Sequence, residues 1–424
     1  MKINYKKTEL ANGLRVITAP MHETQAVAML ILVRVGSRYE TAEWAGMSHF
    51  LEHMFFKGTS KRPTYLHVSK ELDGLGANFN AYTGEEQTGF YVQTSANHFA
   101  EGFDILADML LEGTLPEQEV VKERGVINEE LNMYLDMPQS HVAEITKTAM
   151  FEGNPLGRPI IGTRQTIAAT TREQLIQYKH TYYQPGEMVV AIAGSGVEQA
   201  WINTVKKSFG KLSNELRPSF EPHAGGQKEP RVTLASKKTD QAHFVIALPG
   251  LAKNSKQKPV LQVVNNLFGG MMSSRLFDEV REKRGLAYYV GSGSEEFEET
   301  GAFFVRAGVP IAKIDESVSV VVAQMKRLKT ERVPAPELKH AKENLRGRFS
   351  LELEDSLAVA TFLADQELFL KKIDQPQTLI DRIEKVTASD IMALTKQMID
   401  EHKLTLGIVG PFDDKNRFLK ILTA

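Results

Sequence analysis

The sequence predicts an α+β fold that is built from two similar halves of about 200 residues each. The chain has 424 residues, a length that suggests two to three domains. A polar stretch near its midpoint, residues 213–230, holds three prolines and a Gly-Gly pair and has the composition of a linker. The strands and helices predicted after this stretch follow the same order as those before it. We therefore expect residues 1–215 and 230–424 to form the two halves, with residues 216–229 as the linker.

The composition excludes several classes of protein and of metal site. Hydrophobic residues make up 42% of the chain, charged residues 25%, and the net charge of −2 implies no broad attraction to nucleic acid or anionic membranes. The chain has no cysteine, so any bound metal must be held by histidines and carboxylates. No stretch reaches the roughly 18 apolar residues that span a bilayer, and the first residues lack the apolar core of a signal peptide. We expect a cytoplasmic protein; a trimmed organellar or secreted protein would have the same character.

The first half begins with a hairpin signal, Asn12-Gly13 between strand-like residues 6–10 and 14–18. An apolar third strand is expected over residues 27–35, where Gly36-Ser37 ends it. The other elements expected in this half, delimited mainly by glycines and polar residues, are helices at 63–72, 96–113, 175–182 and 199–209 and a strand at 188–193.

A helix predicted over residues 44–56 contains His49, Glu52 and His53 in the order H-x-x-E-H. Residues four apart lie on one helical face, so both imidazoles can reach one metal ion. Glu52 lies one turn from His49, where it can act as a general base on a water held by that ion. Two histidines and a glutamate at these offsets arise by chance in about a few per cent of chains of this length. The alternative is a solvated helix with scattered polar residues.

A third ligand is expected on the helix predicted over residues 116–136. Its candidates are Glu119, Glu123, Glu129 and Glu130. Glu123 and Glu130 are seven residues apart, so they share a face but stand about 10 Å apart along the axis. One of the two should bind the metal, and the other should support it from outside. An acidic helix on the protein surface is the alternative interpretation.

Two strands are predicted at residues 78–83 and 88–94, and the first of them is polar. A polar strand next to the motif helix can be a sheet edge that pairs with an extended peptide. An ordinary solvent-facing hairpin explains the pattern equally well.

The second half lacks a second H-x-x-E-H motif, so we expect it not to bind metal. Arg281 and Tyr288 can hydrogen-bond a carbonyl or carboxylate of a substrate; a surface arginine and a half-buried tyrosine are the plainer interpretation. The elements expected here include strands at 231–236, 242–248 and 404–409 and helices at 259–268 and 275–283.

With these residues assembled, the chain resembles the pitrilysin family of inverted-zincin metallopeptidases, and within it the bacterial members that are similar to mitochondrial processing peptidase. The resemblance covers nearly the whole chain, and its N-terminal signature is residues 46–59, GMSHFLEHMFFKGT. The family places a metal-binding glutamate about 76 residues after the second histidine, and 76 residues lie between His53 and Glu130. The resemblance thus implies that His49, His53 and Glu130 bind Zn²⁺, with Glu129 leaving some ambiguity of register.

The resemblance also implies roles outside the metal ligands. Glu123, on the helix that resembles the family's distal helix, would be the supporting carboxylate. Asn80 and Ala81 lie in a segment that resembles the edge strand on which these enzymes lay their substrate. Arg281 and Tyr288 resemble the pair that reaches the substrate from the second half.

The fold that the resemblance implies is a clamshell of two homologous αβ halves, each a mainly antiparallel sheet flanked by helices. The implied activity is zinc-dependent endopeptidase cleavage of peptides or unstructured protein segments, with Glu52 activating the water. Family chains of this size work in pairs, and because this one carries both the metal motif and the Arg281–Tyr288 pair, we expect a homodimer rather than a dimer with a homologous partner. The alternatives are a non-catalytic scaffold or partner subunit of the same fold and a zinc hydrolase that leaves peptides intact.

Overall fold

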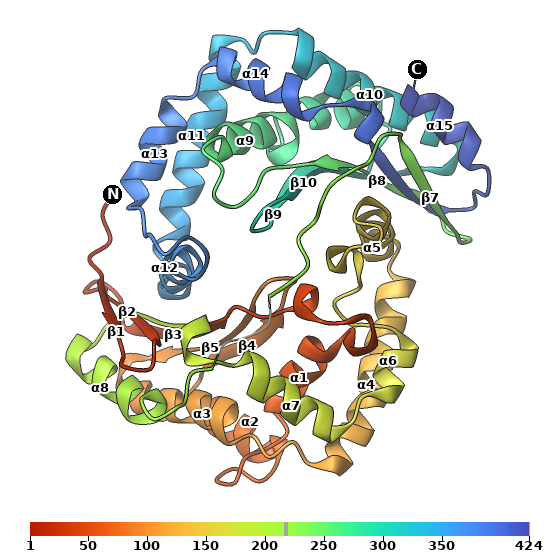
Figure 1. The fold of residues 1–424 in the computed structure, drawn as a ribbon. Coiled ribbons are helices and arrows are strands. Elements are labelled where there is room, and N and C mark those ends of the chain that lie inside the picture. The colour runs from red at the N-terminus through yellow and green to blue at the C-terminus, as the bar shows by residue number, and fades with distance from the viewer. Residues whose placement is uncertain (216–218, 424) are drawn as a thin grey trace. The chain divides into compact units, whose positions relative to one another are not determined.

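The computed structural model describes residues 1–215 and 219–423, so Ala424 and residues 216–218 of the expected linker lie outside the described residues. The chain divides into two compact units. The first comprises Met1–Leu131, Arg158–Glu221 and Ser350–Pro376, and the second comprises Asn132–Gly157, Pro222–Phe349 and Gln377–Ala424. Each unit contains one sheet with helices packed against it (Figure 1), which confirms the predicted α+β class.

The first unit is organised around a sheet whose described strands follow the order β1-β2-β6-β3-β5-β4. Strands β2 and β6 run parallel, whereas the other neighbours run antiparallel. The predicted hairpin is formed by β1 and β2, and Gly13 at its turn has a φ of 85°, which glycine adopts without strain. The strands are β1 (Lys6–Glu9), β2 (Arg15–Pro20), β3 (Ala26–Val33), β4 (Asn78–Thr83), β5 (Thr88–Ser95) and β6 (Met188–Gly194).

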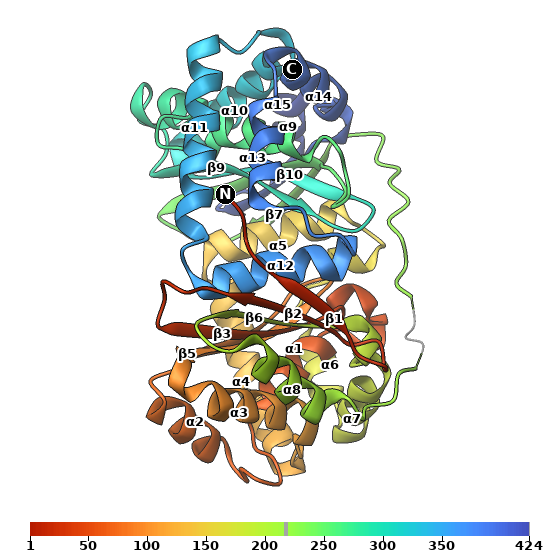
Figure 2. The ribbon, with the colours of Figure 1, turned by 90° about the vertical axis from the view of Figure 1, so that its left-hand side faces the viewer.

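Helices cover both faces of this sheet, as the two views of the ribbon show (Figures 1 and 2). Helix α12 (Ser356–Leu370) packs on β3 and β6, and α3 (Phe99–Glu112) packs on β5 from the other face. Since both faces are covered, nearly all of β3 and all of β6 are buried, and their sequences are apolar without alternation. The other helices that begin in this unit are α1 (Met47–Phe55), α2 (Tyr65–Gly74), α4 (Glu117–Asp136), α6 (Arg164–Ala169), α7 (Arg172–Tyr182) and α8 (Glu198–Phe209).

The second unit repeats the strand arrangement of the first. Its described strands follow the order β7-β11-β8-β10-β9, in which β7 and β11 run parallel and the other neighbours antiparallel. The same directions hold for β2-β6-β3-β5-β4 in the first unit, so these five strands correspond to those of the second sheet, and β1 has no counterpart among the described strands. The strands are β7 (Arg231–Ser236), β8 (Gln241–Pro249), β9 (Tyr289–Glu296), β10 (Gly301–Pro310) and β11 (Thr405–Gly410).

The helices of the second unit also pack on its sheet, with α5 on β8 and β11 and α10 on β10. Two short π-helical segments, Asn266–Gly270 and Phe277–Glu282, occupy parts of the stretches where helices are predicted. The α-helices that lie wholly or largely here are α5 (Pro138–Met150), α9 (Lys258–Asn265), α10 (Ile314–Thr330), α11 (Ala335–Glu352), α13 (Pro376–Glu384), α14 (Ala388–Met398) and α15 (Lys415–Thr423). Among the described residues, no helix combines the length and apolar character that a membrane span requires.

Each unit includes a helix from the other half of the sequence. Helix α12, which follows the linker in sequence, packs in the first unit, and α5, which precedes it, packs in the second. Within the first unit, the buried carboxylate of Glu367 on α12 lies 2.6 Å from Nζ of Lys7 and 3.8 Å from Nη1 of Arg15. The compact units are therefore discontinuous in sequence, whereas the predicted halves, residues 1–215 and 230–424, are continuous. The exchange of these helices accounts for the difference.

Candidate metal centre

The candidate metal centre begins with α1, whose first turn is held by a buried carboxylate. The two oxygens of Glu40 accept hydrogen bonds from the backbone N–H groups of Gly46 (2.8 Å) and Ser48 (2.7 Å), which satisfies donors that a helix start leaves free. Burial raises the pKa of Glu40 to about 7, although these hydrogen bonds oppose the shift. Because Gly46 has a φ of 95°, the α-helix starts at Met47 rather than at Trp44, where the sequence predicts its start.

Helix α1 has one buried face and one partly accessible polar face. His49, Glu52 and His53 share the accessible face, as their spacing predicts, and the centres of the two imidazole rings lie 4.6 Å apart. The opposite face packs in the protein interior through Phe50, Leu51, Met54 and Phe55. The apolar side therefore fixes the rotation of the helix and directs the polar side chains toward one place.

Helix α4 supplies two carboxylates that differ in burial. Glu123 occupies a position on the buried stripe of the helix, which it shares with Val120, Ile127 and Leu131. Glu130 is partly accessible, and Glu129 is exposed. The structure brings Glu130, and not Glu129, to the two histidines.

The side chains of His49, His53 and Glu130 converge at one point. Oε2 of Glu130 lies 3.5 Å from Nε2 of His49 and 3.4 Å from Nε2 of His53. In a tetrahedral zinc site with bonds of about 2.0–2.2 Å, neighbouring ligand atoms lie about 3.3–3.6 Å apart. The trio therefore fits a zinc ion. In the described part of the chain, no other trio of histidines and carboxylates converges in this way.

Glu123 supports this trio from behind His53. Its Oε1 lies 2.9 Å from Nδ1 of His53, and its Oε2 lies 2.6 Å from Nζ of Lys57. These contacts leave Nε2 of His53 facing Glu130, as a metal ligand requires. Sequence reasoning missed Lys57, although its position four residues after His53 places it on the same side of the chain.

The carboxylates set the charge state of the site when no metal is bound. Burial opposes the charge on His53, but hydrogen bonds and charges of Glu123 and Glu130 outweigh burial and raise the pKa of His53 to about 9. Burial would raise the pKa of Glu123, but its contacts with His53 and Lys57 lower it. Hydrogen bonds with His49 and His53 hold the pKa of Glu130 well below its usual range. Both carboxylates are therefore anionic, as a site for a divalent cation requires.

Glu52 lies on the same face of α1 but is held by a different partner. The hydroxyl of Thr83, at the end of β4, donates a hydrogen bond of 2.6 Å to Oε2 of Glu52. Burial, and then the charge of Glu52, raise the pKa of the nearby phenol Tyr183. Sequence reasoning did not single out Thr83 for this contact, because no local pattern connects residues 31 positions apart.

Strand β4 is the last strand in the order of its sheet, and it packs against α1. Residues 78–83 are therefore an edge strand, which also forms a hairpin with β5, and the pairing of this edge with a peptide stays a prediction. Asn80 is exposed, and its Oδ1 accepts a hydrogen bond of 2.9 Å from the N–H of Ala81, which is buried. Among the described strands β4 pairs only with β5, so the backbone groups on its outer side are open to another extended chain.

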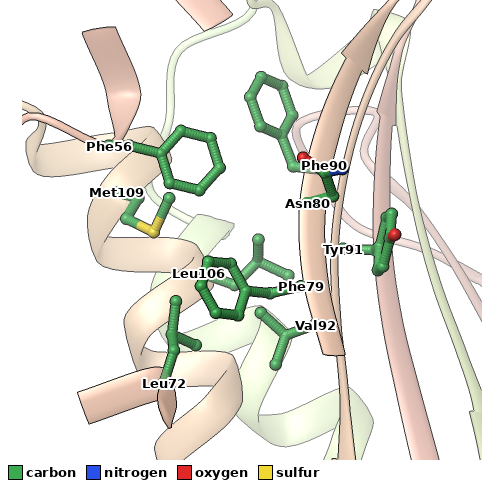
Figure 3. Close-up of a pocket in the computed structure, with 9 residues that line it drawn as sticks. All are labelled: Phe56, Leu72, Phe79, Asn80, Phe90, Tyr91, Val92, Leu106 and Met109. Atoms are coloured by element: carbon green, nitrogen blue, oxygen red, sulfur yellow. The ribbon is translucent and has the colours of Figure 1, made fainter. Parts of the chain in front are cut away.

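A small apolar pocket lies on the helical side of β4 (Figure 3). Phe79 of β4 points toward Leu72 and Leu106 on the helices that cover this face. The residues that line the pocket are Phe56, Leu72, Phe79, Asn80, Phe90, Tyr91, Val92, Leu106 and Met109. The strand beside the metal centre thus has an apolar side and an exposed polar side.

Arg281 and Tyr288 belong to the second unit. The guanidinium carbon of Arg281 lies 4.6 Å from the centre of the Phe277 ring, and Nε lies 3.7 Å from a carboxylate oxygen of Glu282. Tyr288 is 75% exposed, so it contributes little to the core. The role that the sequence predicts for these two residues stays a prediction.

Two family models match the chain, one after the other. The model of insulinase, peptidase family M16, matches residues 15–164, and the model of the peptidase M16 inactive domain matches residues 169–345. The first match contains His49, His53 and Glu130, and the second begins after the last of these ligands.

Similar proteins match along nearly the whole chain. A protein of Streptomyces coelicolor, named an uncharacterized zinc protease, is 33% identical over 416 residues, which cover 97% of this chain and 90% of that protein. The crystal structure of a protease from Helicobacter pylori superposes with a TM-score of 0.90 at 23% identity, covering 97% of this chain and all of that one. A chain of complex III from Candida albicans has a TM-score of 0.84 at 18% identity and covers 98% and 99% of the two chains. These two structures share the fold.

Proposed function

Because the chain belongs to peptidase family M16, we propose that it is a zinc-dependent endopeptidase that cleaves peptides or unstructured protein segments. The observation that carries the proposal is the convergence of His49, His53 and Glu130 at ligand distances, with Glu52 on the same face of α1. A zinc ion held by this trio supplies Lewis acidity, which acidifies a water molecule and polarises a peptide carbonyl.

Residues of this chain transfer the proton and orient the metal ligands. Glu52 takes the proton of the attacking water and later delivers it to the leaving amine, as a general base and then a general acid. Glu123 holds His53 through Nδ1 and so keeps Nε2 directed at the ion. The anionic state of Glu130 and Glu123 is supported by their lowered pKa values.

The substrate of the proposed reaction is an extended chain. An open edge on β4, next to α1, favours a peptide that pairs with the backbone near Asn80 and Ala81. Backbone pairing selects unfolded segments over folded proteins and depends little on sequence. We also propose that Arg281 and Tyr288 hydrogen-bond the substrate.

A non-catalytic subunit is the alternative function. The chain of complex III has the same fold, and its name does not describe a protease. The complete trio of ligands and the supporting Glu123 favour the enzyme, since a scaffold has no need of an ordered metal site. Zinc content together with cleavage of an unstructured peptide separates the two functions.

The test of the proposal is the variant Glu52→Gln, assayed with a quenched fluorogenic peptide that has no secondary structure. The variant should bind zinc at the same stoichiometry as the wild type and lose cleavage, because an amide cannot accept the proton. Glu129→Gln, which removes an exposed carboxylate of α4, is the matched control and should cleave like the wild type. Full activity of Glu52→Gln would refute the assigned base, and zinc-loaded wild type that cleaves no peptide would favour the scaffold.

The proposed enzyme acts as a homodimer. The family resemblance implies that two chains pair, and this chain has the metal motif as well as Arg281 and Tyr288, so it needs no homologous partner to supply either set. The mass of the zinc-loaded protein in solution tests this point, and a monomer would contradict it.

A further inference from the structure

Thr83 connects the edge strand β4 with the carboxylate of Glu52. It is the last residue of β4 and pairs with Thr88 of β5, so its backbone position is set by the sheet. Its hydroxyl donates to Oε2 of Glu52 at 2.6 Å, and both residues are partly buried. A carboxylate has two oxygens, and the hydrogen bond holds one of them.

We propose that Thr83 is a positioning residue that orients the carboxylate of Glu52 and couples the base to the strand on which an extended substrate pairs. This inference rests on the proposed peptidase function and deepens it. Because Thr83 holds Oε2, Oε1 is left to take the proton of the attacking water. The Glu52 side chain can rotate about several torsions, whereas the backbone of Thr83 is fixed by its strand. The hydrogen bond therefore restricts the carboxylate of the base to one orientation.

The position of Thr83 gives this contact a second consequence. Asn80 and Ala81 lie three and two residues earlier on the same strand. A peptide that pairs with the outer backbone groups of this segment orders the strand whose end holds Glu52. Substrate pairing and base orientation therefore act on one rigid element, which favours cleavage of chains that engage β4 over chains that only reach the metal.

The experiment compares Thr83→Val with Thr83→Ser in the zinc-loaded full chain. Valine keeps the β-branched shape that suits a strand but has no donor, whereas serine keeps the hydroxyl. Thr83→Val should lower kcat by about 10- to 100-fold, the effect of removing one hydrogen bond to a charged group. KM and zinc stoichiometry should stay within about twofold of the wild type, since neither the ligands nor the outer edge of β4 is changed. Thr83→Ser should restore most of kcat.

Thr94→Val is the matched control on the neighbouring strand β5. The hydroxyl of Thr94 donates to the backbone oxygen of Leu75 at 3.1 Å, so its loss also removes one hydrogen bond from this unit without touching Glu52. This variant should lose stability and keep its kcat. Equal loss of kcat in Thr83→Val and Thr94→Val would show a merely structural role and overturn the proposal.

Crystal structures of the zinc-loaded variants supply a readout that does not depend on activity. The carboxylate of Glu52 should keep its orientation in Thr83→Ser and adopt another one in Thr83→Val. An unchanged Glu52 in Thr83→Val, or a Thr83→Ser variant as impaired as Thr83→Val, would overturn the inference. A wild type that cleaves no peptide would instead contradict the proposed function, while the orientation of Glu52 would still decide the role of Thr83.

Discussion

Nδ1 of His53 lies 2.9 Å from Oε1 of Glu123, a carboxylate that is almost fully buried on α4. The contact ties a candidate ligand on one helix to the core position of another. It orients the imidazole before any ion is bound, because a turn of the ring would leave Oε1 of Glu123 without its partner in the interior, while Lys57 would still pair with Oε2. The orientation of the His53 imidazole therefore depends on Glu123, which is not itself a candidate metal ligand.

Replacing Glu123 by Gln should lower zinc affinity by about 10- to 100-fold, the usual effect of losing a partner behind a metal ligand. The amide keeps the shape of the side chain but not the charge that holds His53 and Lys57. Competition with a chromogenic chelator measures the affinity. Lys57→Met should lower it in the same direction by a smaller factor, and Lys57→Arg should restore part of it. Unchanged affinity in both Glu123→Gln and Lys57→Met would contradict this support of His53.

The stability of the metal-free protein should depend on pH through His53. Its pKa is raised from 6.5 to about 9 by Glu123 and Glu130, against the effect of burial. Since the folded state binds this proton more tightly, His53 contributes stability that is fully present below about pH 6.5 and is lost as the pH rises through about 9. The difference in melting temperature between metal-free wild type and His53→Asn should therefore shrink over this range. A constant difference would contradict the raised pKa.

Zinc affinity should change with pH in the opposite direction, because the ion must displace the proton on Nε2 of His53. Affinity should rise between about pH 6.5 and 9. In Glu123→Gln the rise should end at a lower pH, since one of the two carboxylates that raise the pKa is gone. Isothermal titration at several pH values, corrected for buffer protonation, measures both curves.

Because α12 packs in the first unit, we expect a large loss of stability when the buried charge of Glu367 on this helix is removed. Glu367 is 1% exposed and lies near Nζ of Lys7 and Nη1 of Arg15, whose guanidinium is also buried. Glu367→Gln should lower the free energy of unfolding by about 3–5 kcal/mol, because it leaves a buried cation without its counter-ion. Glu354→Gln, an exposed control in the same segment, should change it by less than about 0.5 kcal/mol. Urea denaturation compares the two, and equal stabilities would contradict the packing of α12 on β2 and its neighbours.

The proposed contact of Tyr288 with substrate predicts a change in kinetics without a change in fold. The side chain is 75% exposed, so Tyr288→Phe should leave the melting temperature and zinc content unchanged. It should lower kcat/KM by about tenfold, as expected for one lost hydrogen bond to a substrate. Tyr65→Phe, at a tyrosine that is 57% exposed, is the control and should have wild-type kinetics. Equal kcat/KM in both variants would remove Tyr288 from the substrate site.

Local periodicity accounts for the parts of the fold and site that could be predicted. The spacing of His49, Glu52 and His53 places them on one face of any helix, and the seven-residue spacing of Glu123 and Glu130 does the same on α4. The start of α1 differs from the prediction because the left-handed Gly46 and the buried Glu40 define it. Their effect depends on a contact between residues that a periodic pattern does not connect.

Most of the elements, the polar stripe of α1 and the set of glutamates from which a third ligand could come can be read from the sequence, because they follow from backbone geometry within a few turns. The family resemblance singled out Glu130 and Glu123. The structure shows that Glu130 meets the histidines, and it adds that Lys57 stands with Glu123 behind His53 and that Thr83 holds Glu52. It also decided that α5 and α12 pack in the units of the opposite sequence halves. These relationships join residues far apart in the chain, and they arise where separate elements bury their apolar faces together and leave the remaining polar groups to pair with one another.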